Sequence, residues 1–471
     1  MAITGDGIEN LQNQHEEGMT EPLLLVEEGG KKGDARGVGK GGNPWMIYFC
    51  TFVAVCGSYE FGACTGYSSP TQTAIREDLN LSLSEYSVFG SILTFGAMIG
   101  AITSGPIADS IGRKWTLRVA AAFCVAGWLA IYFAEGAIAL DIGRLSSGYG
   151  MGAFSYVVPV FVAEMAPKNR RGVLTAFNQL MICAGGSVVF IIGTVLSWRA
   201  LALTCLIPCA VLLLGLFFIP ESPRWLAKTG QDKEFEAVLQ KLRGEDADVS
   251  DEAAEIQDYI ETLERLPKAK LLDLFRKRYR HSVTDENNWS MACHSHSSGF
   301  SSTVGTITYA ILQVVITAIG AVLVDQAGRK PLLLISGSGI VAACLLVAVS
   351  FFLKAHDWAT TVSPILAVAG ILLYVGSFSV GMGAVPWVVM AEIFPVNIKG
   401  VAGGFATLVN WFGAWLISYT FNYLMSWSSY GTFILYAAIN LLGIVFIALV
   451  VPETKGRSLE QIQAAINKDT A

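Results

Sequence analysis

The sequence predicts an all-α, polytopic membrane protein made of two homologous helical bundles, and three observations support this prediction. First, 53% of the 471 residues are hydrophobic and only 15% are charged, whereas soluble domains carry about 25% charged residues. Second, apolar stretches of about 20 residues, the length that crosses a bilayer core, recur from Trp45 to Val451. Third, three short motifs occur twice along the chain in the same order. The composition excludes a soluble enzyme, and no basic stripe suggests binding to nucleic acid.

The predicted elements follow the apolar windows in chain order. Residues 1–43 form a polar tail that we expect to be disordered and cytosolic, because its apolar cluster, Leu23–Val26, is too short for a signal peptide. Windows of about 19 residues predict eleven helices near 45–67, 86–108, 115–134, 137–160, 173–196, 199–219, 303–324, 331–353, 361–390, 400–424 and 429–451. They divide the chain into an N-terminal six-helix bundle at 44–219, a cytosolic helical insert with a polar stretch at 220–302, a C-terminal bundle of five helices at 303–451 and a cytosolic tail at 452–471.

Small residues are expected to pack inside the bundles. Glycines stand one helical turn apart in several helices, at Gly62 and Gly66, Gly96 and Gly100, and Gly148 and Gly152, and such faces let helix backbones approach closely. The nine cysteines fall almost entirely within apolar stretches, so we interpret them as packing residues and expect no disulfide framework and no metal site. A site at Cys293, His294 and His296 would have too few ligands, too closely bunched.

Repetition is the most specific signal in the chain. DSIGRK at 109–114 recurs as DQAGRK at 325–330, EMAPKNRRG at 164–172 recurs as EIFPVNIKG at 392–400, and PESPRWL at 220–226 is echoed by PETKGRS at 452–458. Three motifs repeated in the same order indicate two homologous halves. Parallel repeats of this kind place a transport path at the interface between the halves.

One helix is missing from the second half. Two helices precede the motif at Asp109, but only one precedes Asp325, and the stretch Arg280–Ser302 is too polar to face lipid. Lys and Arg cluster before the first helix and after the second, fourth and sixth, which places the amino terminus in the cytosol. A single crossing would then leave Arg329 outside. Either the chain has lost a helix, which we favour because the motifs on both sides are intact, or helix 303–324 does not cross.

Several segments together resemble the sugar porter family of the major facilitator superfamily: the paired GRK motifs, GRLSSGYGMG at 143–152, PESPRWL at 220–226, PWVVMAEIFP at 386–395 and PETKGRS at 452–458. GYSSP at 66–70 and GMGAVPW at 381–387 are most similar to plant early-responsive-to-dehydration-like monosaccharide transporters. The resemblance implies twelve helices in two six-helix bundles, alternating access and a hexose site midway through the membrane. It also implies a Gln-Gln pair and an Asn on the seventh helix, which is the helix this chain lacks.

A sugar site needs amides that replace water around the hydroxyl groups and an aromatic face for the ring. Side chains of this chemistry within the predicted helices are Gln179, Gln313, Phe378, Trp387 and Asn410. By the resemblance they align with the sugar contacts of the family. The alternative is that these residues only link neighbouring helices.

Ionisable residues within the membrane are functional candidates. Glu60 and Arg144 lie at a matched depth of about 10 Å below the outer surface, which suggests an ion pair and proton coupling. By the resemblance, however, the acid of the proton symporters aligns with Cys64. The alternative is a local pair of Asp141 with Arg144 at helical spacing.

The repeated loop charges have a role that the resemblance implies. Glu164 would face Lys399 and Arg113, and Glu392 would face Arg171, while Asp325 and Arg329 mirror Asp109 and Arg113. Such cytosolic salt bridges would hold the halves together when the site opens outward. The alternative is that these charges only set the orientation of the helices.

The sequence therefore predicts a monosaccharide transporter that works by alternating access, with a glucose-like sugar, the lipid bilayer and, if it is coupled, protons as partners. It is not expected to be an enzyme or to need a cofactor. A truncated chain that does not transport, and a carrier of polyols or inositol, are the alternatives. EPLLL at Glu21–Leu25 resembles a dileucine-type sorting signal, which favours the vacuolar membrane over the plasma membrane.

Overall fold

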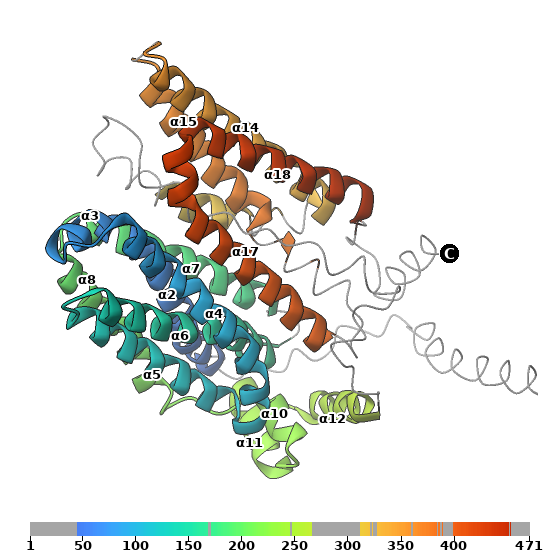
Figure 1. Ribbon diagram of the computed structural model, residues 1–471. Helices are drawn as coiled ribbons and strands as arrows, with labels where there is room; N and C mark the ends of the chain where they lie inside the picture. The colour runs from blue at the N-terminus through green and yellow to red at the C-terminus, as the bar shows by residue number, and fades with distance from the viewer. Residues whose placement is uncertain are drawn as a thin grey trace, which may run out of the picture.

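Figure 1 shows a molecule built of helices throughout the part that the structure describes. This computed structural model describes residues 45–167, 171–244, 247–265, 311–320, 327–358, 361–383 and 399–451, and single positions at 323, 385, 386, 389 and 453. The predicted tail at 1–43 and the polar stretch before the second half lie outside these residues.

The N-terminal half forms one bundle. Its helices are α2 (Trp45–Gly66), α3 (Ser68–Asp78), α4 (Leu83–Ile111), α5 (Arg113–Tyr132), α6 (Ala137–Met165), α7 (Arg171–Gly193), α8 (Trp198–Thr204) and α9 (Leu206–Gly215). α2 packs against α6, α7 and α9, and both α4 and α5 pack against α6. A single hydrophobic cluster runs through these helices and buries Leu93, Trp128 and Phe154.

Three short helices follow this bundle: α10 (Pro223–Lys228), α11 (Asp232–Arg243) and α12 (Ser250–Arg265). They bury a small hydrophobic cluster of their own around Phe235, Leu239 and Ile256. We call the side of the molecule that carries α10–α12 the insert side.

The C-terminal half contains a short helix at Ile311–Gly320, α14 (Arg329–Ala355), α15 (Ser363–Ser377), the π-helix η3 (Phe378–Met382), α17 (Lys399–Trp427) and α18 (Ser429–Val450). α14 packs against α15 and α18. α17 packs against α4 of the other half, so it lies along the seam between the two bundles, as Figure 1 shows.

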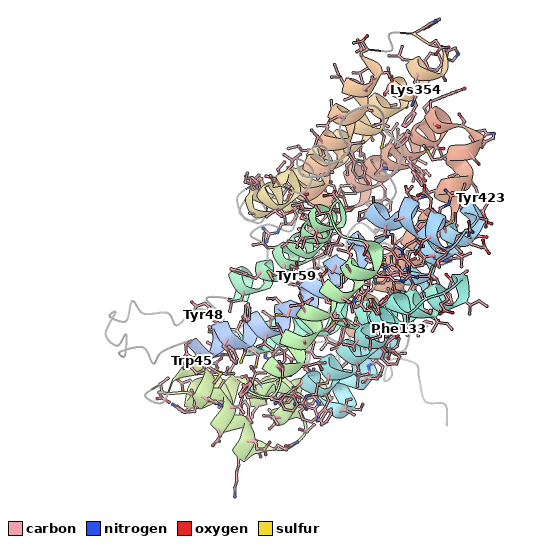
Figure 2. All side chains as sticks on the ribbon, turned by 90° about the vertical axis from the view of Figure 1, so that its left-hand side faces the viewer. Trp45, Tyr48, Tyr59, Phe133, Lys354 and Tyr423 are labelled. Atoms are coloured by element: carbon pink, nitrogen blue, oxygen red, sulfur yellow. The ribbon has the colours of Figure 1, made fainter. Side chains whose placement is uncertain are left out.

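The outer faces of the bundles are apolar. Within the described residues, eight helical segments are long and apolar enough to cross a membrane by length and composition, counting α8 with α9 and α15 with η3 as single segments. Trp45 and Tyr48 are exposed, and Figure 2 places them close together at the start of α2, where amphipathic aromatic side chains suit a membrane interface. The all-α polytopic fold is therefore confirmed, while the number of eleven spans stays a prediction.

Three elements differ from the windows read along the sequence. The predicted helix at 199–219 is interrupted at Cys205 and ends at Gly215. The predicted helix at 361–390 changes to a π-helix at Phe378. α3 was not expected, because its composition is polar and windows of apolar residues detect only spans; Pro70 in its first turn suits a helix start, where a missing N–H costs nothing.

The predicted duplication appears in the local geometry of the two halves. Gly112 and Gly328 both have positive φ, at 93° and 94°. After each glycine a helix begins. The first N–H groups of this helix donate to a glutamate that follows the last helix of the same half. Glu221 accepts from the N–H groups of Arg113 and Lys114 at 3.0–3.1 Å, and Glu453 accepts from those of Arg329 and Lys330 at 3.0 Å. Both are carboxylates at a helix N-terminus, where the dipole favours negative charge.

The helix at Ile311–Gly320 runs towards the insert side. Ile316 lies against Gly376 of α15, and Gly320 lies against the carbonyl of Ser379 in η3, so this helix is parallel to the α15–η3 segment. α14 leads away from the motif at Gly328, and α15–η3 returns. In Figure 1 the red end of α18, next to this motif, points the same way as the ends of the N-terminal helices near α10. Arg265 and the start of the helix at Ile311 therefore lie towards opposite ends of the bundles.

The predicted glycine pairs pack helix against helix. A side chain at Gly96 would lie 2.4 Å from the carbonyl oxygen of Leu145, and one at Gly100 would lie 2.1 Å from that of Tyr149. On the facing helix, Gly148 lies in the same way against Leu93. The close approach of α4 to α6 thus depends on the absence of side chains at these positions.

We expect Gly96→Leu to destabilise the protein by about 3 kcal/mol, because the new side chain would overlap backbone and force the two helices apart. Gly90 lies on the same helix, and a β-carbon added there would meet no neighbouring atom within 4 Å, so Gly90→Leu is the matched control. Thermal unfolding of purified protein in detergent measures both. Equal melting temperatures for the two variants would contradict the packing argument.

Candidate functional site

A polar group joins the two bundles at the seam. Gln179 of α7 and Gln313 of the Ile311–Gly320 helix both donate from Nε2 to the Sγ atom of Cys183, each at 3.8 Å. The Cys183 thiol also lies 3.4 Å from the hydroxyl oxygen of Thr317. Both glutamines are half-buried. The structure therefore brings together two of the predicted substrate residues, one from each half.

Asn410 and its neighbour Trp411 lie at the seam on α17. Asn410 is buried, with 4% of its surface exposed. Trp411 is also buried, and its ring lies 5.7 Å from that of Phe61 on α2. The Nε1 group of Trp411 has no hydrogen-bond partner within the described residues, so it is an available donor in an apolar setting. The sequence analysis did not include Trp411. Its position next to the candidate Asn410 was the signal that could have identified it.

The two predicted aromatic contacts have different outcomes. Phe378 begins η3 and stacks on Tyr374, with ring centres 6.5 Å apart, in the hydrophobic cluster of the C-terminal half. The hydrogen bonds of the two glutamines do not involve it. Trp387 lies outside the described residues.

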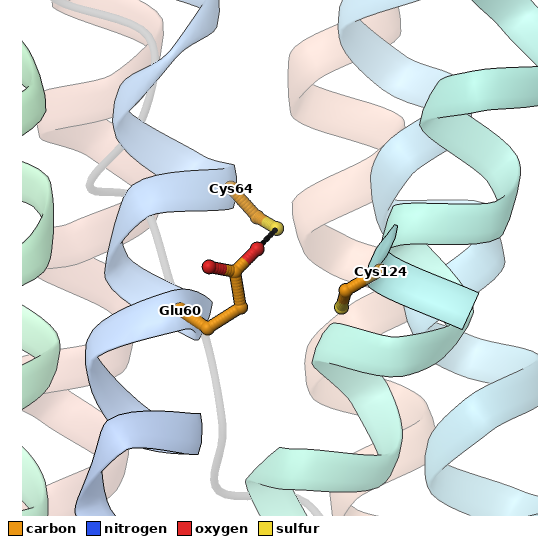
Figure 3. Close-up of side chains that lie close together, drawn as sticks. All are labelled: Glu60, Cys64 and Cys124. Atoms are coloured by element: carbon orange, nitrogen blue, oxygen red, sulfur yellow. Dashed lines mark hydrogen bonds between the residues drawn. The ribbon is translucent and has the colours of Figure 1, made fainter. Parts of the chain in front are cut away.

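Glu60 is fully buried in the N-terminal bundle. One carboxylate oxygen, Oε1, accepts hydrogen bonds from the indole N–H of Trp128 on α5 and from the thiol of Cys64, the latter at 3.4 Å. Figure 3 shows Glu60 and Cys64 one turn apart on α2, facing Cys124. The second oxygen, Oε2, has no hydrogen-bond partner among the described residues.

Arg144 is also fully buried, but neither predicted ion pair forms. Its guanidinium donates to the carbonyl oxygen of Cys64 at 2.9 Å and to the hydroxyl of Ser68, and it lies over the ring of Phe89 at 4.9 Å. Among the described residues, no salt bridge joins Arg144 to Glu60, and the Oδ1 atom of Asp141 has no partner. Matched depth gives no information on which way side chains point around a helix, and this is why the expectation of a pair was wrong.

The expected charge network is present within the first half. Arg113 forms a two-bond pair with Glu164, with both N···O distances at 2.9 Å, and also contacts Asp109 at 3.0 Å. Ser222 donates to Glu164 at 2.5 Å, and Lys228 of α10 pairs with Asp109 at 3.0 Å. Burial raises the pKa of the nearby Glu221 carboxyl, and hydrogen bonds from backbone N–H groups partly offset this rise. The network ties α4, α5 and α6 to the insert-side helices.

The predicted salt bridges between the halves fall on residues whose side chains the structure does not describe. Asp325 and Glu392 lie outside the described residues, and so do the side chains of Arg171 and Lys399. Arg329 corresponds to Arg113 in the second half, because its backbone N–H donates to Glu453 as that of Arg113 donates to Glu221. The inter-half contacts stay a prediction.

We expect Glu164→Ala to destabilise the protein by about 2 kcal/mol, because it leaves the guanidinium of Arg113 buried with Asp109 as its one acidic partner among the described residues. Lys228→Ala removes a pair whose side chains are 48% and 47% exposed, and such pairs contribute about 0–1 kcal/mol. Melting temperatures in detergent compare the two. A larger loss for Lys228→Ala would contradict the ranking.

Comparison with known proteins identifies relatives of this fold and site. A family profile described as "Sugar (and other) transporter" matches residues 46–284 and 295–466. Sugar transporter ERD6-like 7 of Arabidopsis thaliana is 64% identical over 461 residues, which cover 95% of this chain and 98% of that protein. Sugar transporter ERD6-like 16 of the same plant is 56% identical over 440 residues, covering 90% and 91%.

Solved structures of the xylose transporter XylE share the fold. The proton:xylose symporter XylE of the major facilitator superfamily, bound to 6-bromo-6-deoxy-D-glucose, matches with a TM-score of 0.71 at 25% identity, covering 90% of this chain and 99% of that one. The inward-open form from E. coli matches with the same TM-score and covers 89% and 99%. The break in the family profile, at 285–294, falls within the polar stretch at Arg280–Ser302.

Proposed function

The chain belongs to the sugar transporter family of the major facilitator superfamily, and we propose that its substrate is a glucose-like monosaccharide bound at the seam between the bundles. The family is one of membrane transporters of sugars rather than enzymes, and two bundles that meet at a seam suit transport by alternating access. We propose the identity of the sugar, the residues that bind it and the coupling of its transport to protons.

The polar group at the seam carries the proposal. Gln179 and Gln313 come from opposite halves, and both donate to the weak acceptor Cys183. A thiol is a weak hydrogen-bond acceptor, so an amide that donates to it at 3.8 Å loses little binding energy when it donates to a sugar hydroxyl instead. Asn410 and Trp411 add a buried amide and an indole N–H at the same seam. A site shared by both halves can open to one side or the other as the halves tilt.

Uptake of radiolabelled glucose by yeast that lacks its own hexose carriers tests the substrate. We expect unlabelled glucose to compete and myo-inositol to compete poorly, because the relatives at 64% and 56% identity are described as sugar transporters. Stronger competition by inositol or a polyol would instead identify a carrier of that class.

Glu60 is the residue that we propose for proton coupling. It is a buried carboxyl group on α2, and its Oε2 atom has no hydrogen-bond partner among the described residues. Cys64 connects it to Arg144, because the Cys64 thiol donates to Glu60 and the Cys64 carbonyl accepts from Arg144. The observation that favours coupling is that the carboxyl group of Glu60 is fully buried within the helical bundle, where an ionisable group is costly and is therefore a functional candidate.

We expect Glu60→Gln to abolish the increase of uptake at acidic external pH while leaving sugar exchange across the membrane intact, because glutamine keeps the size but cannot carry a proton. Glu135→Gln, in an exposed loop, is the control. Uptake that responds to external pH equally in both variants would remove Glu60 from the mechanism.

We propose the vacuolar membrane as the location, on the basis of the EPLLL segment at Glu21–Leu25. A fluorescent fusion in plant cells with Leu23 and Leu24 replaced by Ala should move to another membrane. Unchanged placement would show that this segment is not the signal.

The alternative function is that of a chain that does not transport. It is favoured by the break in the family profile at 285–294 and by the polarity of the surrounding stretch, where a membrane helix is expected. In this case the chain would bind sugar weakly through the remaining seam residues.

A further inference from the structure

We propose that Glu60, Cys64 and Cys124 form a binding site for a thiophilic metal ion inside the N-terminal bundle. One carboxylate oxygen and two Sγ atoms of these residues all lie within 4.8 Å of one another, and all three side chains are buried. Figure 3 shows the acid and one thiol on α2 facing the second thiol from α5. None of these groups contributes to the seam described above.

The composition of the cluster fits a soft divalent ion. Thiolate ligands favour Zn²⁺ and related ions over Mg²⁺ or Ca²⁺. With metal–sulfur bonds of about 2.3 Å and metal–oxygen bonds of about 2.0 Å, tetrahedral ligand atoms lie about 3.5 Å apart. The thiol of Cys64 already lies 3.4 Å from the carboxylate of Glu60, and no ligand atom is more than 4.8 Å from another. Three protein ligands leave the fourth position of a tetrahedral shell for a water molecule.

Two further observations point to a ligand at this place. The Oε2 atom of Glu60 is buried without a hydrogen-bond partner in the described part of the chain, and such an atom is costly unless something binds it. The guanidinium of Arg144 contacts the carbonyl of Cys64 at 2.9 Å, so a positive charge is already present to offset a negatively charged set of ligands.

A purely structural role explains less of this arrangement. The Trp128 indole and the Cys64 thiol satisfy only one oxygen of Glu60. Cysteines that merely fill space need not converge from two helices on a carboxylate. Because the metal site depends only on how these three side chains meet, it holds or fails independently of which sugar is carried.

Titration of the purified full-length chain with Cd²⁺ tests the proposal, because bound cadmium thiolates absorb in the ultraviolet. Cys293, His294 and His296 are first replaced by Ala, so that these residues cannot contribute ligands. We expect one Cd²⁺ per chain, displaced by an excess of Zn²⁺ because thiolates bind the softer Cd²⁺ more tightly. In this background Cys64→Ser, Cys124→Ser and Glu60→Gln should each weaken binding at least about tenfold, or 1.4 kcal/mol. Cys50→Ser, which changes a buried cysteine of α2 outside the cluster, should leave binding unchanged.

Absence of the absorption band in the background protein, or binding that is equal in Cys64→Ser and Cys50→Ser, would overturn the proposal. If the cluster variants fail to fold, the zinc X-ray absorption spectrum of the background protein decides. A shell of sulfur at about 2.3 Å with one oxygen at about 2.0 Å supports the site. A shell of nitrogen and oxygen alone refutes it.

Discussion

Insertion of an apolar helix in place of residues 281–302 is expected to raise glucose uptake at least about tenfold, which is 1.4 kcal/mol or more in the transport rate. The inserted helix would carry two adjacent glutamines and an asparagine, the pattern that resemblance to the sugar porter family implies for its seventh helix. Uptake would be compared with that of the unchanged chain in yeast lacking hexose carriers.

The topology gives the physical reason. Arg265 and the start of the helix at Ile311 lie towards opposite ends of the bundles, because the Ile311–Gly320 helix runs parallel to α15 and η3. The chain between them carries Asp285, Glu286 and two asparagines, and charged and amide groups are costly in lipid. An inserted apolar helix of this length is favourable in lipid, and its amides are intended to face the seam that already holds Gln179 and Gln313.

A second insertion of equal length, built of Leu and Ala without the amides, separates topology from chemistry. If it restores uptake as well as the first, the loss concerns insertion alone. Equal uptake with and without either helix would show that the polar stretch does not limit transport. Protease protection of the loop at Arg329 reports, in each version, which side of the membrane this residue occupies.

The positions of the membrane helices could be predicted from sequence because lipid imposes a minimum apolar length. The duplication could be predicted too, and Gly112 and Gly328 show why it was visible: both halves need a residue of positive φ before a helix whose N-terminus a glutamate caps. The glycine pairs were predictable for a similar reason, since Gly96 and Gly100 face backbone and tolerate no side chain.

Contacts within the site were less predictable. Depth in the membrane follows from counting residues, but the direction of a side chain around its helix depends on how the helices are rotated. This is why Arg144 was expected to meet an acid and instead meets the carbonyl of Cys64. The convergence of Cys64 with Cys124 has the same origin, because helices α2 and α5 are distant in sequence.

Gln179→Ala and Gln313→Ala are each expected to weaken glucose binding about tenfold, and the double variant more. A sugar hydroxyl that loses a protein partner in a water-poor site is left unsatisfied, at about 1–3 kcal/mol. Dissociation constants of the purified chain, from a scintillation proximity assay, measure the effect without requiring transport. Gln231→Ala, an exposed position, is the control.

Cys183→Ala distinguishes the two interpretations of these glutamines. The thiol of Cys183 accepts a hydrogen bond from each glutamine. If the glutamines serve only to link the bundles, Cys183→Ala should lower the melting temperature as much as the glutamine variants do. The affinity for sugar should then be unaltered in all of these variants. If the glutamines bind sugar, Cys183→Ala should leave affinity unchanged or slightly raise it, because the amides no longer exchange one partner for another. A loss of affinity in Cys183→Ala equal to that in Gln179→Ala would therefore contradict the proposed substrate site.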